Sequence, residues 1–206
     1  MDPTKKTQLT YDQIYTDYAT RNKNPGSNIV ALRRIFKNLL PKNEPIHLLD
    51  AGCANGRDVG YFLKQGYEVT GIDLCEPFLK LAKLEYPQVK FLKMDLRNLT
   101  FKDSSFNAIW AMASLLHIPK QELPSTLQGF YRVLKPNGIF LVSVMEGSFD
   151  SLRENAKLNW PARHFSDYQR DELRTLLEQA GFKVLRLSLK PTSWGPLWLN
   201  FFCTRI

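Results

Sequence analysis

The stretch from Ile46 to Gly60, with the sequence IHLLDAGCANGRDVG, restricts the fold of this chain more than any other segment. Mostly apolar residues end at Asp50, small residues follow as far as Gly56, and Arg57 then begins a helical pattern. This order predicts a buried strand, a tight turn and the start of a helix. Small residues let a ligand approach the backbone, and the free N–H groups at the helix start suit an anion. We therefore expect a ligand with a negative end at this turn.

Strand and helix patterns alternate from this stretch onward. Helices are predicted from the glycine turn to Gly66, over 76–84 and over 120–134, and strands over 46–50, 67–73, 89–94, 106–111 and 139–145. Such alternation predicts a parallel sheet with helices covering both faces.

The flanking segments have different patterns. Residues 1–10 are expected to be frayed, whereas 11–21 and 28–40 carry apolar residues at helical spacing and predict a helical cap ahead of the first strand. Residues 147–163 show no clean period, which predicts a long loop or irregular lid. A helix over 167–181 and strands over 182–189 and 197–204 are predicted to follow.

Length and composition indicate the number of domains, the cellular compartment and the kinds of site to expect. The 206 residues suffice for one domain with a substantial core. No apolar run approaches the roughly 18 residues of a membrane span and the N-terminus lacks an apolar signal segment, so we expect a cytoplasmic protein that does not enter a membrane. Three scattered cysteines and three histidines predict neither a disulfide framework nor a metal centre.

The net charge of +8 is unevenly distributed. Residues 1–43 carry eight basic and three acidic side chains, 44–146 carry eleven of each, and 147–206 carry nine basic and six acidic. The basic surplus could attract an acidic or phosphorylated substrate, or nucleic acid. Solvated, lysine-rich helix faces are the alternative explanation.

The spacing in the turn narrows the choice of ligand. A dinucleotide fingerprint needs glycines at positions 52, 54 and 57, but Ala54 and Arg57 occupy the last two. The turn instead resembles the first motif of the class I S-adenosylmethionine-dependent methyltransferases, an acidic residue followed by alternate glycines, which Asp50, Gly52 and Gly56 match. Ala54 replaces the middle glycine, adds one methyl group and is expected to need a negative φ.

Residues at the ends of the next strands fit a nucleoside. Asp73 ends the second strand, where it could accept both ribose hydroxyls, although it could also simply cap the next helix. Asp95, after the third strand, could accept a hydrogen bond from an adenine amino group, with Met94 and Leu96 lining the ring. Ala111 ends the fourth strand, where backbone would lie against the cofactor.

The resemblance covers about half of the chain, residues 46–145, and includes the LKPNG turn at 134–138. It implies an α/β fold: one Rossmann-like, doubly wound, seven-stranded sheet, mostly parallel with an antiparallel last strand, with helices on both faces and an N-terminal helical cap. The motifs DAGCANGRD, WAMASLLHIP and WLNFF are similar to a group of small, mostly uncharacterised bacterial methyltransferases. We expect one domain, with 1–43 as the cap, 44–146 as the cofactor-binding core and 147–206 as the acceptor side.

The implied cofactor is S-adenosyl-L-methionine, with S-adenosyl-L-homocysteine as product. Arg57 and Arg21 could each bind its carboxylate bidentately. Tyr11 and Tyr18 could close over it, although aromatic residues at helical spacing are also typical of simple packing. The predicted cofactor-binding residues are Asp50, Ala51, Gly52, Cys53, Ala54, Asn55, Gly56, Arg57, Asp73, Leu74, Met94, Asp95, Leu96, Ala111, Tyr11, Tyr18 and Arg21.

Methyl transfer depends mainly on positioning, which can lower a barrier by up to roughly 7 to 11 kcal/mol, so no catalytic residue is obligatory. A hydroxyl acceptor would need a general base, and His117, on the loop after the fourth strand, is the candidate. Packing or bonding to the backbone is the alternative role of that histidine. Candidates for the acceptor pocket lie in the irregular segments beyond the sheet: Trp160, Arg163, His164, Phe165 and Trp194.

The predicted function is methyl transfer from S-adenosylmethionine to a small-molecule acceptor. One alternative is an RNA or tRNA methyltransferase that uses the basic terminal segments, although the sequence lacks an Asn-Pro-Pro-aromatic motif and paired catalytic cysteines. Another is a methyltransferase-like binding protein without turnover, which Ala54 keeps open. A nicotinamide dehydrogenase is disfavoured by the glycine spacing.

Overall fold

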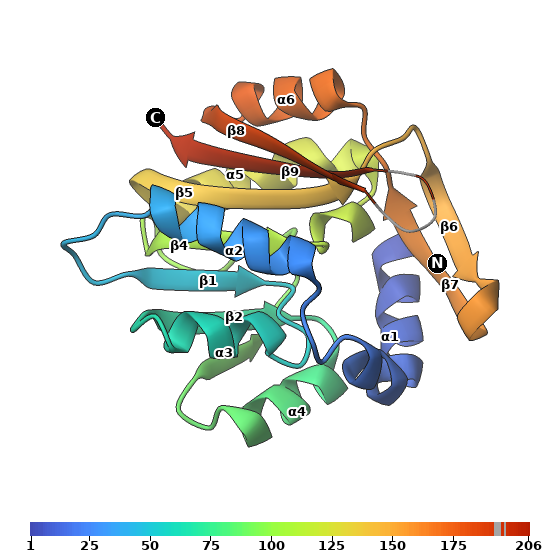
Figure 1. Cartoon of the computed structure of the whole chain (residues 1–206). Helices are drawn as coiled ribbons and strands as arrows, with labels where there is room; N and C mark the ends of the chain where they lie inside the picture. Colours follow the sequence, from blue (N-terminus) through green and yellow to red (C-terminus); the bar gives the residue numbers. More distant parts are fainter. Residues whose placement is uncertain (192–194, 196) are drawn as a thin grey trace.

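A seven-stranded sheet forms the centre of the computed structural model, which describes residues 1–191, 195 and 197–206 (Figure 1). Its first five strands are parallel, and β9 runs antiparallel to both of its neighbours. The predicted fold class is therefore confirmed. In spatial order the strands are β3 (Lys90–Lys93), β2 (Glu68–Asp73), β1 (His47–Ala51), β4 (Phe106–Met112), β5 (Leu134–Met145), β9 (Leu197–Arg205) and β8 (Phe182–Pro191).

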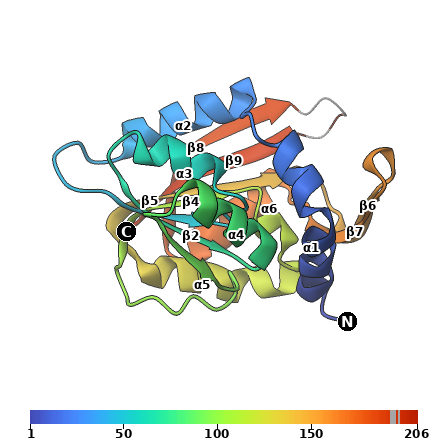
Figure 2. The same ribbon diagram turned by 90° about the horizontal axis from the view of Figure 1, so that it is seen from below.

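Helices cover both faces of this sheet (Figure 2). Neighbouring residues of β1 show why, since Leu48 and Leu49 are both fully buried but belong to separate hydrophobic clusters on opposite faces. One face packs against α2 (Ser27–Leu39), α3 (Arg57–Leu63) and α4 (Glu76–Glu85), and the other against α5 (Leu123–Val133) and α6 (Arg170–Gln179). Three short 3-10 helices are η1 (Leu115–His117), η2 (Lys120–Glu122) and η3 (Ala156–Leu158).

Helix α1 extends over Pro3–Arg21, so the prediction that residues 1–10 are frayed is wrong. The Asp2 carboxylate caps the helix by accepting from the Thr4 N–H, and proline is favourable in the first turn. The buried side of the first half is polar: the Thr10 hydroxyl donates to the Ala162 carbonyl at 2.8 Å. Because threonine rather than apolar side chains faces inward, no hydrophobic period marks these turns.

The segment predicted as an irregular lid forms a β-hairpin, so that prediction is also wrong. Strands β6 (Asp150–Asn155) and β7 (Trp160–Ser166) pair antiparallel as a separate two-stranded sheet. Most of β6 is exposed, so the sequence lacks the alternation of a half-buried strand. Strand β7 attaches the hairpin to α1, because the His164 N–H donates to the Thr7 hydroxyl at 2.9 Å.

The LKPNG segment interrupts the pairing of β4 with β5. Phe106 pairs with Leu134 but Ala108 pairs with Ile139, so the residues between form a bulge in β5, and Asn137 has a φ of 62°. Within the described ranges, no helix has both the length and the apolarity needed to cross a bilayer.

Candidate functional site

A cavity lies at the carboxyl ends of β1, β2, β3 and β4, with α1 on its other side. The lining residues lie between Thr4 and Ile118, and many of them meet because the parallel strands all end at the same edge of the sheet. Most of the residues predicted to bind the cofactor line this first cavity: Tyr11, Tyr18, Gly52, Cys53, Ala54, Asn55, Arg57, Asp73, Leu74, Met94, Asp95 and Leu96.

The glycine turn has left-handed backbone at several positions. Gly52 and Gly56 both have a φ of 83°. A Cβ added at Gly52 would lie 2.4 Å from Cβ of Ser114, so the loop after β4 also requires glycine there. Ala54 has a φ of 46°, which makes the predicted negative φ wrong. This conformation costs an L-residue roughly 1 to 2 kcal/mol.

Asp73 fixes the turn from the neighbouring strand. Its Oδ2 accepts from the Ala54 N–H and its Oδ1 from the Cys75 N–H, each at 2.9 Å. Burial raises the pKa of this carboxyl above its ordinary value. Each oxygen can accept more than one hydrogen bond, so the carboxylate can still accept from a pair of ligand hydroxyls. Bonding to the start of α4 and binding a ribose are therefore compatible.

Positive charge gathers at the start of α3. Arg57 and Arg33 both pair with Asp58, with 2.7 Å between Nη2 of Arg57 and Oδ2 of Asp58. Although burial opposes it, these two guanidiniums hold the pKa of Asp58 below its usual value. The Nε–H of Arg57 is buried without a hydrogen-bond partner within the described residues. This group therefore has a free donor for a ligand carboxylate at the first cavity.

The structure places four of the predicted cofactor-binding residues outside both cavities. Asp50, Ala51, Gly56 and Ala111 are buried and line neither of the two cavities described in this section. Burial raises the pKa of Asp50 well above its usual value. Its Oδ2 has no partner in the part of the chain that the structure describes. Strand β4 continues to Met112, and Met112, Ala113 and Ser114 reach the cavity in place of Ala111.

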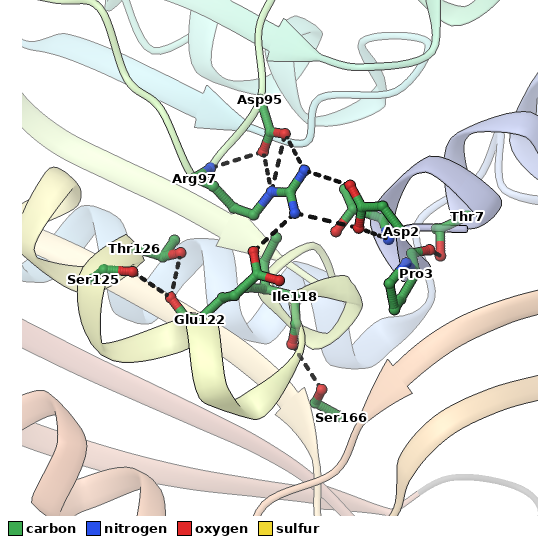
Figure 3. A network of polar contacts seen from close by, with 11 residues as sticks. Asp2, Pro3, Thr7, Asp95, Arg97, Ile118, Glu122, Ser125, Thr126 and Ser166 are labelled. Atoms are coloured by element: carbon green, nitrogen blue, oxygen red, sulfur yellow. Dashed lines mark hydrogen bonds and ion pairs between the residues drawn. The ribbon is translucent and has the colours of Figure 1, made fainter.

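Arg97 links Asp95, which lines the first cavity, to the start of α1 (Figure 3). Its Nη2 lies 2.8 Å from Oδ2 of Asp95 and 3.0 Å from Oδ2 of Asp2, and its Nη1 lies 2.8 Å from Oε2 of Glu122. One guanidinium thus joins three carboxylates from separate parts of the chain. Asp95, the predicted partner of an adenine amino group, accepts from the backbone N–H, Nε and Nη2 of Arg97, with two contacts at each oxygen. An adenine amino group would have to displace one of these contacts.

A second cavity of about 790 Å³ adjoins the first. Predicted acceptor-pocket residues Trp160, Arg163 and Phe165 line it, together with Arg21. The residues shared by both cavities are Tyr11, Tyr18, Asn22, Arg57, Met112, Ala113 and His117.

His164, another candidate for the acceptor pocket, does not reach either cavity. His164 is buried and lines neither cavity, because its Nε2 lies 3.0 Å from both the Ser166 hydroxyl and the Asp150 carboxylate. Trp194 lies outside the described residues. Arg21, which was predicted to bind the cofactor, lines the second cavity and not the first, and it pairs with Asp17 at 2.8 Å, with both side chains exposed.

Hydrogen bonds between α1, η1 and β7 define the state of His117. Its Nδ1 lies 2.6 Å from the His164 carbonyl, which can only accept, so Nδ1 carries the proton. Its Nε2 therefore accepts from the Tyr11 hydroxyl at 2.9 Å, and that hydroxyl accepts from Nη1 of Arg163 at 2.9 Å. Burial lowers the pKa of His117 to about 3 and raises the pKa of Tyr11. The imidazole is neutral and its lone pair is occupied.

Sequence reasoning missed several residues that line the first cavity. Those of α1 could have been found from the pair Asp2 and Pro3, a typical helix start. Met112, Ala113 and Ser114 could have been found because they follow the predicted fourth strand. The missed residues are Thr4, Thr7, Gln8, Asn22, Asp58, Cys75, Phe78, Met112, Ala113, Ser114 and Ile118.

Comparisons with known proteins agree with this geometry. A family described as a methyltransferase domain matches residues 49–142. An uncharacterized methyltransferase of Synechocystis sp. is 30% identical over 152 residues, which cover 69% of this chain and 69% of that protein. A malonyl-(acyl-carrier protein) O-methyltransferase of Pectobacterium atrosepticum is 26% identical over 141 residues, 68% of this chain but only 52% of the relative.

A solved structure is similar over nearly the whole chain. It is the 1,6-didemethyltoxoflavin-N1-methyltransferase of Burkholderia thailandensis with bound 1,6-didemethyltoxoflavin and S-adenosylhomocysteine. The TM-score is 0.75 at 25% identity, and the match covers 96% of this chain and 87% of that chain.

Proposed function

The chain belongs to the class I S-adenosylmethionine-dependent methyltransferases, and from this premise we propose that it methylates a small molecule held in the second cavity. S-adenosylmethionine is the methyl donor of this family. When bound, it supplies a methyl group already activated by a sulfonium sulfur, so the protein mainly has to hold a nucleophile in line.

One observation carries the proposal: two cavities share a wall at the carboxyl edge of the sheet. The first is lined by the glycine turn and the acidic strand ends, and the second by aromatic and basic side chains. A cofactor in the first cavity would present its methyl group toward the second, past residues that line both, among them Tyr11, His117, Met112 and Ala113. The structure of the Burkholderia relative contains a small-molecule ligand together with S-adenosylhomocysteine. This supports the proposal that a cofactor and an acceptor bind at the same time.

The residues of the first cavity fit this cofactor. Asp73 would accept from the two ribose hydroxyls, and Asp95 from the adenine amino group. The free Nε–H of Arg57 would bind the carboxylate of the methionine tail. Asp50 is buried and lines neither cavity, so it would act on the turn and not on the cofactor directly.

The role of His117 as a general base stays a prediction. A pKa of about 3 makes this imidazole a weak proton acceptor, and Tyr11 already occupies its lone pair. The geometry supports a positioning role instead, in which His117 holds the Tyr11 hydroxyl at the wall shared by both cavities. This arrangement favours acceptors whose nucleophile carries no proton that must be removed.

The ribose role predicts that Asp73→Ala weakens the binding of S-adenosylhomocysteine roughly tenfold or more, because hydrogen bonds to a charged group are each worth about 1.5 to 3 kcal/mol. Calorimetric titration measures the affinity, and a thermal melt checks folding. Asp73→Asn, which keeps the size and one acceptor oxygen, replaces it if the alanine variant does not fold. Asp103→Ala, at an exposed carboxylate that lines neither cavity, is the matched control. Unchanged affinity in a folded Asp73 variant would refute the ribose role.

The activity itself is tested with methyl-labelled cofactor, offered with a panel of small molecules and with bulk RNA. Label in one or more small molecules is the expected result. Labelling of RNA alone would contradict the proposal.

A further inference from the structure

The second cavity is strongly basic. The basic side chains that line it are Arg21, Arg57, Arg153, Lys157, Arg163 and Lys190, and Glu154 is the one acidic residue among its described lining residues. Several of these charges are already paired: Arg21 with Asp17, Arg57 with Asp58 and Arg153 with Asp167. A neutral or cationic acceptor would gain nothing from the remaining charge.

Arg163 is the most buried of these basic groups, with 7% of its surface exposed. No acidic side chain of the described residues pairs with it, and its Nε–H has no hydrogen-bond partner there. Its one side-chain hydrogen bond within that part of the chain runs from Nη1 to the Tyr11 hydroxyl. A guanidinium has five N–H donors, so most of its donor capacity is available to a ligand.

Aromatic rings surround this guanidinium. Its Cζ lies 5.1 Å from the ring centroids of Tyr11 and Phe165, and 5.2 Å from that of Trp160. Ring faces stabilise a cation and hold its plane in place, but they leave its charge uncompensated. A buried cation with neutral neighbours is unfavourable unless an anion completes the site.

We propose that the acceptor is a carboxylic acid with an aromatic or other largely apolar body, and that Arg163 binds its carboxylate. This inference rests on the proposed function and specifies the acceptor for the same site. The planar fork of a guanidinium matches a carboxylate bidentately. The rings of Tyr18, Trp160 and Phe165 supply the apolar part of the cavity wall. Arg163 lines the second cavity but not the first, so the carboxylate would lie in the acceptor's cavity, beside the Tyr11 hydroxyl of the shared wall.

Matched acid and amide pairs test this proposal directly. The probes are benzoate, 1-naphthoate and indole-3-acetate, each with its carboxamide, titrated calorimetrically into protein saturated with S-adenosylhomocysteine. The expected result is that at least one acid binds tenfold or more tightly than its amide. Equal binding of acid and amide across the panel would overturn the proposal.

Variants then assign the preference to Arg163. Arg163→Met should abolish the preference for the acid, and Arg163→Lys, which keeps the charge but loses the fork, should retain part of it. Arg186→Met, at an exposed arginine outside both cavities, should leave it unchanged. Persistence of the full preference in Arg163→Met would overturn the assignment, and if that variant does not fold, an undiminished preference in Arg163→Lys would do so. Phenyl phosphate is included because binding of the phosphate but of no carboxylate would also contradict the proposal.

Two measurements keep this test separate from the family function. If the wild-type protein does not bind S-adenosylhomocysteine, the proposed function is contradicted. Normal binding of that product, with methyl transfer to neutral molecules only, would instead refute the carboxylate while leaving the methyltransferase function intact.

Discussion

The backbone conformation of Ala54 differs from the one that its residue type predicts. A negative φ is the ordinary choice for alanine, yet the backbone there is left-handed. The Asp73 carboxylate accepts from the Ala54 N–H. Ser114, in the loop after β4, packs closely against Gly52, two residues before Ala54. Contacts with two other strand ends therefore impose the conformation, and the protein tolerates the strain in the wall of the first cavity.

Replacing Ala54 with glycine should raise the free energy of unfolding by about 1 kcal/mol, because glycine adopts this φ without strain. For a chain of this size, that corresponds to a melting temperature higher by about 2 to 4 °C. Ala108→Gly, in the interior of β4, is the control and should lower stability. A melting temperature of Ala54→Gly at or below that of the wild type would show that the turn is not strained.

Most residues of the first cavity could be predicted from the sequence because they directly follow predicted strands. Asp73, Met94 and Asp95 reach the cavity for this reason alone, since parallel strands end at one edge. Ala111 was misplaced because β4 is one residue longer than predicted. His164 faces Ser166 rather than the acceptor cavity, an orientation set by the pairing of β7 in a hairpin that the pattern does not reveal.

At the scale of elements, α1 and the β6–β7 hairpin complete the site, and these are the elements that the sequence predicts least well. They support one another with polar contacts, such as that between Thr10 and Ala162, which are 152 positions apart in the chain. A local pattern cannot report a partner so distant. The core strands differ, because their burial on both faces leaves continuous apolar runs that are visible in the sequence.

Arg97 fastens α1 to the core, so removing its charge should loosen that helix. In Arg97→Met, the carboxylates of Asp2, Asp95 and Glu122 lose their shared cation and repel one another. We expect faster hydrogen exchange in the first turns of α1, and S-adenosylhomocysteine binding weaker by about 1 kcal/mol, a factor of about five.

Hydrogen exchange read by mass spectrometry locates this change. Arg170→Met removes a surface ion pair with Glu146 outside the first cavity and should leave α1 unaffected. Unaltered exchange in α1 of the Arg97 variant would mean that the threonine contacts alone hold the helix.

At the scale of the whole molecule, His117 connects α1, the core and the hairpin around one buried imidazole. Burial lowers its pKa from 6.5 to about 3 in the folded protein. At pH values between these two, His117 is protonated in the unfolded chain but neutral in the folded protein. The free energy of unfolding should therefore be fully retained above about pH 6.5 and fall by up to about 1.4 kcal/mol per pH unit as the pH drops toward 3.

Comparing His117→Gln with the wild type isolates this effect. The variant should be less stable at pH 7.5, but the difference should shrink by about 2 kcal/mol at pH 5, because glutamine does not titrate. Denaturant titrations at both pH values measure it, with His47→Gln as the control for removing a surface imidazole. Stability profiles of His117→Gln and wild type that stay parallel would exclude a buried neutral histidine.

The wall shared by the two cavities couples their occupants. Tyr11, Tyr18 and His117 face both spaces, so a molecule in either one becomes part of the surface that the other molecule meets. Thermodynamic linkage then requires that a bound acceptor changes the affinity for the methyl donor by the same factor as a bound donor changes the affinity for the acceptor. With both ligands bound as proposed, neither affinity is a property of one cavity alone.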